Sequence, residues 1–159
     1  MKKPMAKKAI KVFLDSNVIL SGLLSDKGAP RIILDILSLR LPFIIGITGQ
    51  YNIFEIKKNM LKKLPALLPV YEKYFSELNL EIVPLPSPED LERFFGHIAD
   101  KDVPVLASAF IGKADFLVTG DKRDFAKLKQ KKSYPFPILS PSEFLDVIGA
   151  ELQKGNLVK

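Results

Sequence analysis

Short apolar runs alternate with amphipathic stretches along most of this chain. The runs are typical of buried strands and lie at residues 10–15, 43–47, 80–83, 116–119 and 136–139. Apolar residues spaced about every 3.6 positions predict helices between them. These helices are expected at residues 17–24, 30–39, 50–64, 66–78 and 103–111, after Ser87 (including His97), through Leu128, and after Ser140. The alternation predicts an α/β fold, a single-domain parallel five-stranded sheet flanked by helices on both faces (α/β/α).

The length of 159 residues suits one folded domain. We expect a basic, flexible N-terminus at residues 1–8, the folded domain at residues 9–152, and a C-terminal tail at residues 153–159. The first apolar stretch ends at Asp15, which is too early for an export signal, and no run approaches the ~18 apolar residues of a membrane span. A soluble, cytoplasmic protein is therefore expected, with no membrane partner.

The composition limits the chemistry that the chain can perform. It contains no cysteine and one histidine, which excludes disulfides, thiolate sites and multi-histidine zinc sites. A lone histidine such as His97 is typical of a surface or packing position. Any bound metal must rely on oxygen ligands, which favours Mg²⁺ or Mn²⁺.

Four carboxylates are placed where a parallel sheet would bring them together. Asp15 and Asp121 each follow an apolar run, Asp102 begins the apolar helix, and Glu55 lies in the helix after the second run. Ligands bind in the crevice at the carboxyl ends of parallel strands. Acidic side chains gathered there repel one another unless a cation neutralises them, so their convergence would indicate a divalent metal.

Other polar residues beside these acids are candidate accessory groups. Asp124 and Asp100 are further candidate ligands, Asn17 is placed to orient Asp15, and Thr119 offers a hydroxyl to a ligand or water. For Asp15, Asp102 and Asp121 the alternative is a helix cap. Glu55 is the weakest candidate, because it lies opposite the stripe formed by Ile53, Phe54, Met60, Leu61 and Leu64, and is placed for an ion pair with Lys58.

Basic residues cluster next to these acids. The net charge is +6, of which the lysines before residue 12 supply five. Further clusters follow Glu55, with Lys57 and Lys58, and Asp121, with Lys122 and Arg123. Such clusters suit a phosphate backbone, although a charge run is also typical of a solvated helix face.

The chain resembles the PIN-domain family, and within it the VapC-like ribonuclease toxins of toxin–antitoxin pairs. The motifs that carry the resemblance lie at residues 12–18, 102–109 and 117–121, and the similarity spans roughly residues 10–148. It implies a PIN-like fold and a metal-dependent endoribonuclease with Asp15, Glu55, Asp102 and Asp121 at its centre. It also implies dimerisation and a cognate antitoxin as partner.

The chemistry that follows from this resemblance is hydrolysis of RNA. Bound Mg²⁺ or Mn²⁺ would activate water and neutralise charge on the phosphate. Lys122, Arg123, Lys57 and Lys58 would hold the RNA backbone, and single-stranded RNA is the expected substrate because it can enter a crevice.

Two other functions stay open. A non-catalytic RNA-binding module would use the basic clusters alone. A phosphatase of the haloacid-dehalogenase kind also places an aspartate after its first strand, and its Gly-Asp-x-x-Asp motif resembles residues 120–124. That family has a second aspartate where this chain has Asn17, which carries no transferable proton.

Overall fold

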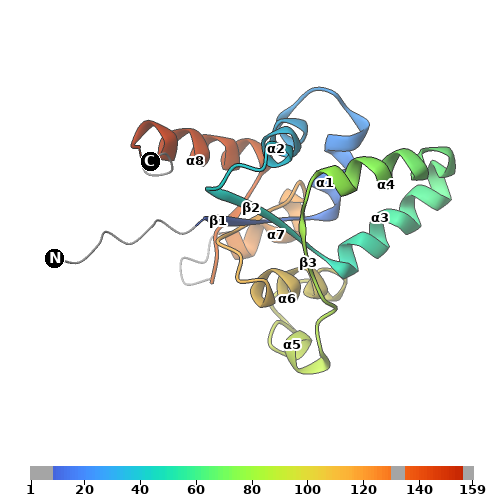
Figure 1. Cartoon of the computed structure of the whole chain (residues 1–159). Coiled ribbons are helices and arrows are strands. Elements are labelled where there is room, and N and C mark those ends of the chain that lie inside the picture. Colours follow the sequence, from blue (N-terminus) through green and yellow to red (C-terminus); the bar gives the residue numbers. More distant parts are fainter. Residues whose placement is uncertain (1–8, 130–134, 156–159) are drawn as a thin grey trace.

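A computed structural model describes residues 9–129 and 135–155 of the chain. The expected N-terminal segment, residues 1–8, lies outside the described residues, as do residues 130–134 and 156–159. The described part forms a central sheet with helices above and below it (Figure 1).

The sheet has five strands, all parallel, in the order β3-β2-β1-β4-β5. They are β1 (Ile10–Leu14), β2 (Ile44–Gly49), β3 (Glu81–Val83), β4 (Phe116–Val118) and β5 (Ile138–Leu139). The predicted fold class is thereby confirmed. The chain winds outward from β1 in both directions, so the strand order reverses between β1 and β4, and this is the point where ligands bind in such sheets.

Helices connect the strands and pack on both faces. They are α1 (Ser16–Leu24), α2 (Ala29–Ser38), α3 (Gln50–Lys63), η1 (Pro65–Leu67), α4 (Leu68–Glu77), α5 (Pro88–Glu92), η2 (Asp100–Asp102), α6 (Val103–Ile111), α7 (Lys122–Lys129) and α8 (Pro141–Gln153). No helix within the described residues combines the length and apolar character that crossing a membrane requires.

Each face of the sheet has its own hydrophobic core. Val12 and Leu14 of β1 point to one face, where they pack with buried side chains of α1, α2, α4 and α8. Phe13 points to the other face and packs with side chains of α6 and α7. Alternating residues of a strand serve opposite faces, which explains why the strands are almost uniformly apolar. Figure 1 shows these two helical layers.

Some helix boundaries follow the sequence prediction and others do not. Ser87 and Ser140 form the expected capping boxes with Asp90 and Glu143. However, the helix after Ser87 ends at Glu92, and His97 lies beyond it, directly after Gly96, whose φ of 84° is left-handed. The fifth strand spans only residues 138–139, and residue 137 is a proline, which lacks the N–H that a sheet requires.

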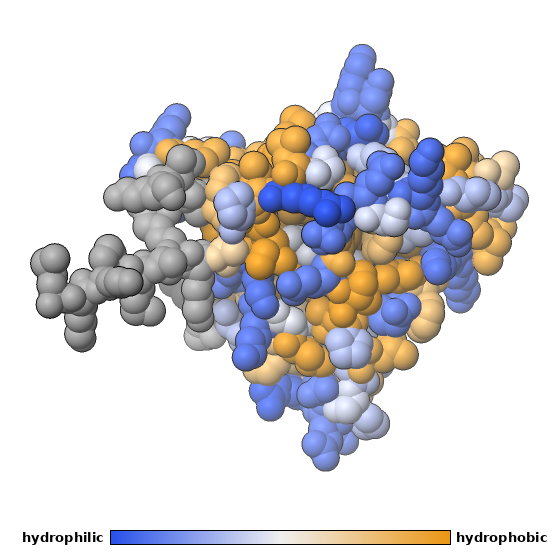
Figure 2. Space-filling model, in the orientation of Figure 1, coloured by the Kyte–Doolittle hydropathy of each residue, from blue (hydrophilic) through white to orange (hydrophobic). Residues whose placement is uncertain are grey.

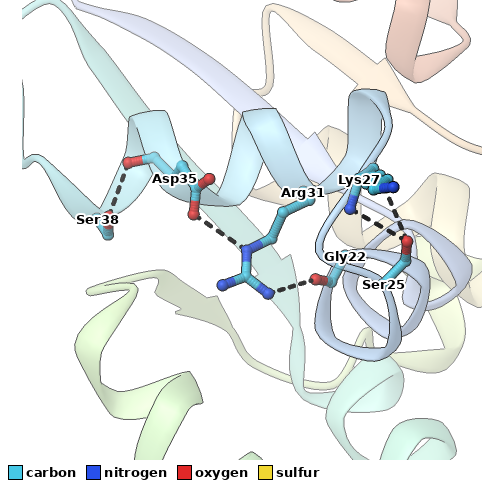
Figure 3. A network of polar contacts seen from close by, with 6 residues as sticks. All are labelled: Gly22, Ser25, Lys27, Arg31, Asp35 and Ser38. Atoms are coloured by element: carbon cyan, nitrogen blue, oxygen red, sulfur yellow. Dashed lines mark hydrogen bonds and ion pairs between the residues drawn. The ribbon is translucent and has the colours of Figure 1, made fainter.

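One arginine joins three helices beside the sheet. Arg31 of α2 contacts Asp35 at 3.1 Å and donates to the carbonyl of Gly22 in α1 at 3.4 Å (Figure 3). Its guanidinium also lies 5.2 Å from the ring centroid of Tyr74 in α4. At Gly22, α1 and α2 pack tightly against each other.

Replacing Gly22 with alanine should therefore destabilise the fold. A Cβ at Gly22 would lie 2.4 Å from Leu34 Cδ1 and 3.1 Å from the carbonyl oxygen of Pro30. We expect Gly22→Ala to lower the free energy of unfolding by about 1–3 kcal/mol through overpacking, measured by urea unfolding.

Gly149 of α8 is the matched control, because it is also a helical glycine and a Cβ there would meet no atom within 4 Å. Gly149→Ala should stabilise the protein by about 0.5–1 kcal/mol through helix propensity. An equal gain from Gly22→Ala would contradict the tight packing of α1 on α2.

Candidate metal centre

Two of the predicted acids lie side by side at the carboxyl edge of the sheet. Asp15 follows β1, and Asp121 follows the neighbouring strand β4 after two residues. The backbone N–H of Asp15 donates to the carbonyl of Val118 at 3.0 Å, which continues the pairing of the two strands. The point where the strand order reverses thus brings both carboxylates to one edge.

Asp15 is almost fully buried, with 6% of its surface exposed. Its Oδ1 accepts hydrogen bonds from the N–H of Ser16 at 2.7 Å and from Asn52 Nδ2 at 3.2 Å. Its Oδ2 accepts from the Thr119 hydroxyl at 2.8 Å. Burial raises the pKa of Asp15 to about 6, although the bonds from Thr119 and Ser16 favour the charged form.

The two predicted accessory residues next to these acids differ in what they do. Thr119 contacts both aspartates, since its hydroxyl donates to Asp15 and accepts from the Asp121 N–H at 3.1 Å. Asn17, predicted to orient Asp15, makes no hydrogen bond to it in the described part of the chain. The Asn17 Oδ1 instead accepts from the N–H of Gly120 at 2.9 Å and so holds the turn that carries Asp121.

Asp121 both caps a helix and belongs to the acidic group. Its Oδ1 accepts from the N–H of Asp124 at 3.1 Å, which is a capping contact for α7. Carboxylate oxygens of Asp102, Asp121 and Asp124 all lie within 4.8 Å of one another, a separation that one cation can bridge. Capping and ligand binding are thus compatible at this residue.

Asp102 is the acid with the strongest sign of an unmet partner. It stands at the start of α6, yet its side chain makes no capping hydrogen bond, so the helix-cap alternative is wrong. Its Oδ2 is buried and has no hydrogen-bond partner among the described residues. Burial, followed by the negative charge of Asp124, raises the pKa of Asp102 to about 7. A buried, unpartnered carboxylate oxygen is what a cation would satisfy.

A lysine partly neutralises this group. Lys101 Nζ lies 2.8 Å from Asp124 Oδ2, and this hydrogen bond lowers the pKa of Asp124. The neighbouring Asp100 is exposed and does not belong to the group of three acids.

Glu55 faces the site, contrary to the helical-wheel argument. The buried residues of α3 are Asn52, Ile53, Ile56 and Met60, whereas Phe54 and Leu61 are more than half exposed. Glu55 is half-buried, and its Oε1 accepts from the Ser16 hydroxyl at 3.1 Å. The helical wheel misplaced Glu55 because it treated every apolar side chain of the helix as buried.

Three residues of the site escaped the sequence analysis. Ser16 and Asn52 contact Asp15, and the hydroxyl of Tyr51 donates to the carbonyl of Lys101 at 3.2 Å. Burial and the charges of nearby acids raise the pKa of Tyr51. Asn52 precedes Glu55 by three positions, which places both on one helix face, and this spacing is the signal that was available.

The basic residues flank the acids. Lys57 and Lys58 are exposed on α3, and Arg123 is exposed in the first turn of α7. Lys122 begins α7, but its side chain lies outside the described residues.

The donors at this edge fit Mg²⁺ or Mn²⁺. They are carboxylate oxygens, which hard divalent cations prefer. One of them, on Asp102, is buried without a hydrogen-bond partner in the part of the chain that the structure describes. The raised pKa values of Asp15 and Asp102 show that burial and crowding disfavour their charged forms, which a bound cation would favour.

Comparisons with known proteins agree with the fold described above. A family model described as PIN domain matches residues 11–123, more than half of the chain. No curated protein matches. Two crystal structures share the fold at low sequence identity. That of PAE2754 from Pyrobaculum aerophilum has a TM-score of 0.61 at 15% identity and covers 92% of this chain and 99% of its own. That of VapBC2 from Rickettsia felis, bound to a DNA fragment from their promoter, has a TM-score of 0.55 at 14% identity, with coverage of 82% and 98%.

The raised pKa of Asp15 predicts a pH-dependent cost to stability. The pKa rises from its ordinary value of 3.8 to about 6 in the fold, so the folded state binds the proton more tightly. Proton binding by Asp15 therefore stabilises the folded state fully below pH 3.8, and this stabilisation is lost as pH rises through 6. At about 1.4 kcal/mol per pKa unit, ionised Asp15 costs the metal-free fold roughly 3 kcal/mol at pH 7.5.

Asp15→Asn should therefore stabilise the metal-free protein at pH 7.5 and change little at pH 4. Its Oδ1 can still accept from Ser16 and Asn52, and its amide can donate to the Thr119 oxygen. Urea unfolding in EDTA at both pH values measures the difference. Loss of stability at pH 7.5 would contradict the electrostatic cost.

Proposed function

Because the chain belongs to the PIN-domain family, whose members are generally nucleases, we propose that it is a metal-dependent endoribonuclease that cleaves RNA phosphodiester bonds. The observation that carries this proposal is the convergence of Asp102, Asp121 and Asp124 within 4.8 Å, beside buried Asp15. Acids gathered at the reversal point of a parallel sheet form a site for a cation and a phosphate together.

The proposed ligands are carboxylates of two kinds. Asp102, Asp121 and Asp124 would hold Mg²⁺ or Mn²⁺ directly, and Asp15 and Glu55 line the inner side of the same edge. When bound, the cation would supply Lewis acidity toward the phosphate and lower the pKa of water. Thr119 keeps Asp15 and Asp121 in their relative positions through its two hydrogen bonds.

The flanking basic residues would hold the RNA backbone. Lys58 lies one helical turn after Glu55, on the same side of α3, with Lys57 next to it. Arg123 follows Asp121 at the start of α7, as does Lys122. Positive charge on both sides of an acidic edge suits a single strand whose phosphates cross the site, so single-stranded RNA is the proposed substrate.

A protein partner is also proposed. The fold resembles that of a VapBC2 crystal structure, which supports a toxin role with a cognate antitoxin. Apolar side chains at the tip of the α3–α4 hairpin are exposed, as Figure 2 shows in orange, and provide a surface for an antitoxin or for a second copy of the chain. They are Leu61, Leu64, Leu67 and Val70. A cytoplasmic location stays a prediction.

The two rival functions make different predictions about the acids. A non-catalytic RNA-binding module gives no reason for Asp102 to leave a buried oxygen unpartnered. A haloacid-dehalogenase-like phosphatase would need a proton donor at position 17, where Asn17 instead accepts a hydrogen bond from Gly120. Labelling of Asp15 by an acyl phosphate mimic would favour the phosphatase.

Asp121→Asn should strongly reduce cleavage while preserving the fold. Asparagine keeps an oxygen that can cap Asp124, but it removes one charge from the acidic group. We expect cleavage of single-stranded RNA in Mn²⁺ to fall by about 100-fold or more, since even outer-shell changes at metal sites cost about 10–100-fold. Single-turnover assays with Mg²⁺, Mn²⁺ or EDTA measure the rate, and filter binding measures RNA affinity, which should be kept or increased.

Asp146→Asn is the control, because Asp146 is an exposed acid of α8, a helix that packs on α2 and β5. It should cleave like the wild type. RNA binding without metal-dependent cleavage by the wild type would reject the nuclease and favour the binding module.

A further inference from the structure

We propose that Asn52 is a positioning residue that determines which oxygen of Asp15 is left for a cation. Through Ser16, it also fixes Glu55 relative to Asp15. This inference rests on the proposed function, because it concerns the same carboxylates, and it assigns a role to two residues that carry no charge.

Asn52 is buried completely, and its amide hydrogens contact the inner side of the site. It lies in the first turn of α3 and has an exposed fraction of 0%. Its Nδ2 donates to Asp15 Oδ1 at 3.2 Å and to the Ser16 oxygen at 2.9 Å. Both amide hydrogens of Asn52 are therefore directed toward Asp15 and Ser16, the two residues that follow β1.

The hydrogen bonds of Asp15 leave little free. A carboxylate oxygen has two lone pairs, and those of Oδ1 are taken by the Ser16 N–H and by Asn52. From the described residues Oδ2 accepts one bond, that of Thr119, which leaves a single lone pair for a ligand. Without Asn52, Oδ1 would regain a lone pair and Asp15 could turn or bind through either oxygen.

The orientation of the Asn52 amide is imposed by chemistry. An ionised carboxylate only accepts hydrogen bonds, so the NH₂ group must face Asp15. Its oxygen then points the other way, where it is buried and no described residue donates a hydrogen bond to it. A buried acceptor without a hydrogen bond destabilises a fold, so stability alone does not explain this residue.

Gly49 provides the space for this arrangement. A Cβ at Gly49 would lie 2.8 Å from Asn52 Oδ1 and 2.9 Å from Ser108 Oγ. Gly49 is the last residue of β2, and its lack of a side chain leaves room for the Asn52 amide. The amide oxygen makes no hydrogen bond there with the described residues. This observation again indicates that the donor end of Asn52 is what the fold preserves.

Ser16 extends the contact to the second acid. Its hydroxyl oxygen accepts from Asn52, and its hydroxyl donates to Glu55 Oε1 at 3.1 Å. Asn52 and Glu55 stand three positions apart on α3, while Ser16 begins α1. The three side chains thus join two helices and hold both inner carboxylates at fixed positions.

Asn52→Leu tests the proposal, because leucine has a similar shape and no donor. Isothermal titration of the metal-free protein with Mn²⁺, well below the unfolding temperature, should show an affinity lower by about 10-fold or more. In Mn²⁺-saturated assays kcat should fall while KM for RNA stays near the wild-type value. Ser16→Ala should act in the same direction, and it provides the test if Asn52→Leu does not fold.

Ser108→Ala is the matched control. Ser108 is equally buried, adjoins the same glycine, and its hydroxyl makes no hydrogen bond with any described residue. It should bind Mn²⁺ like the wild type. If the wild type binds Mn²⁺ and Asn52→Leu and Ser16→Ala bind it equally well, the inference is wrong and the proposed function stands. If the wild type neither binds Mn²⁺ nor cleaves RNA, the proposed function falls and the inference falls with it.

Discussion

Burial of carboxylates at one edge of the sheet, together with their mutual repulsion, is the constraint on which the rest of this structure depends. The reversal of strand order between β1 and β4 leaves Asp15 and Asp121 adjacent, while α3 and the start of α6 add Glu55 and Asp102. Each element is placed by its own apolar packing, so the cores on the two faces stabilise a charge arrangement that is unfavourable by itself. The hydrophobic effect stabilises the fold, and this stabilisation offsets the unfavourable electrostatic energy of the acids.

The inner and outer acids are compensated in different ways. Asp15 receives three hydrogen bonds from neutral donors, one of them from Thr119 and another from Asn52. Neutral donors reduce the cost of a buried charge without cancelling it, and its pKa therefore stays raised. The outer acid Asp124 instead contacts the ammonium of Lys101. The Lys101 side chain is exposed and flexible, so it can move away from Asp124.

The fold could be predicted from the sequence because periodicity and strand position are local properties. Five apolar runs predicted the parallel sheet, and the acids at its edge followed from where the runs ended. Side-chain direction on a partly buried helix could not be predicted this way. On α3 the amide of Asn52 is buried and Phe54 is exposed, which reverses the expected order of polarity and led the wheel to place Glu55 on the wrong side. Asn17 was misjudged because its partner, Gly120, is distant in sequence.

The division into inner and outer acids also explains why uncharged residues matter here. A cation that replaces the Lys101 ammonium at Asp124 meets an outer group that can adjust, since its carboxylates are half-exposed and one oxygen of Asp102 has no partner. The inner carboxylate cannot adjust, because Asn52, Ser16 and Thr119 occupy all but one of its lone pairs. The fixed position of Asp15 then sets the geometry of the proposed metal site, and the outer acids Asp102, Asp121 and Asp124 adjust to it. A fixed inner acid beside adaptable outer ones is the arrangement that positions a ligand while still admitting it.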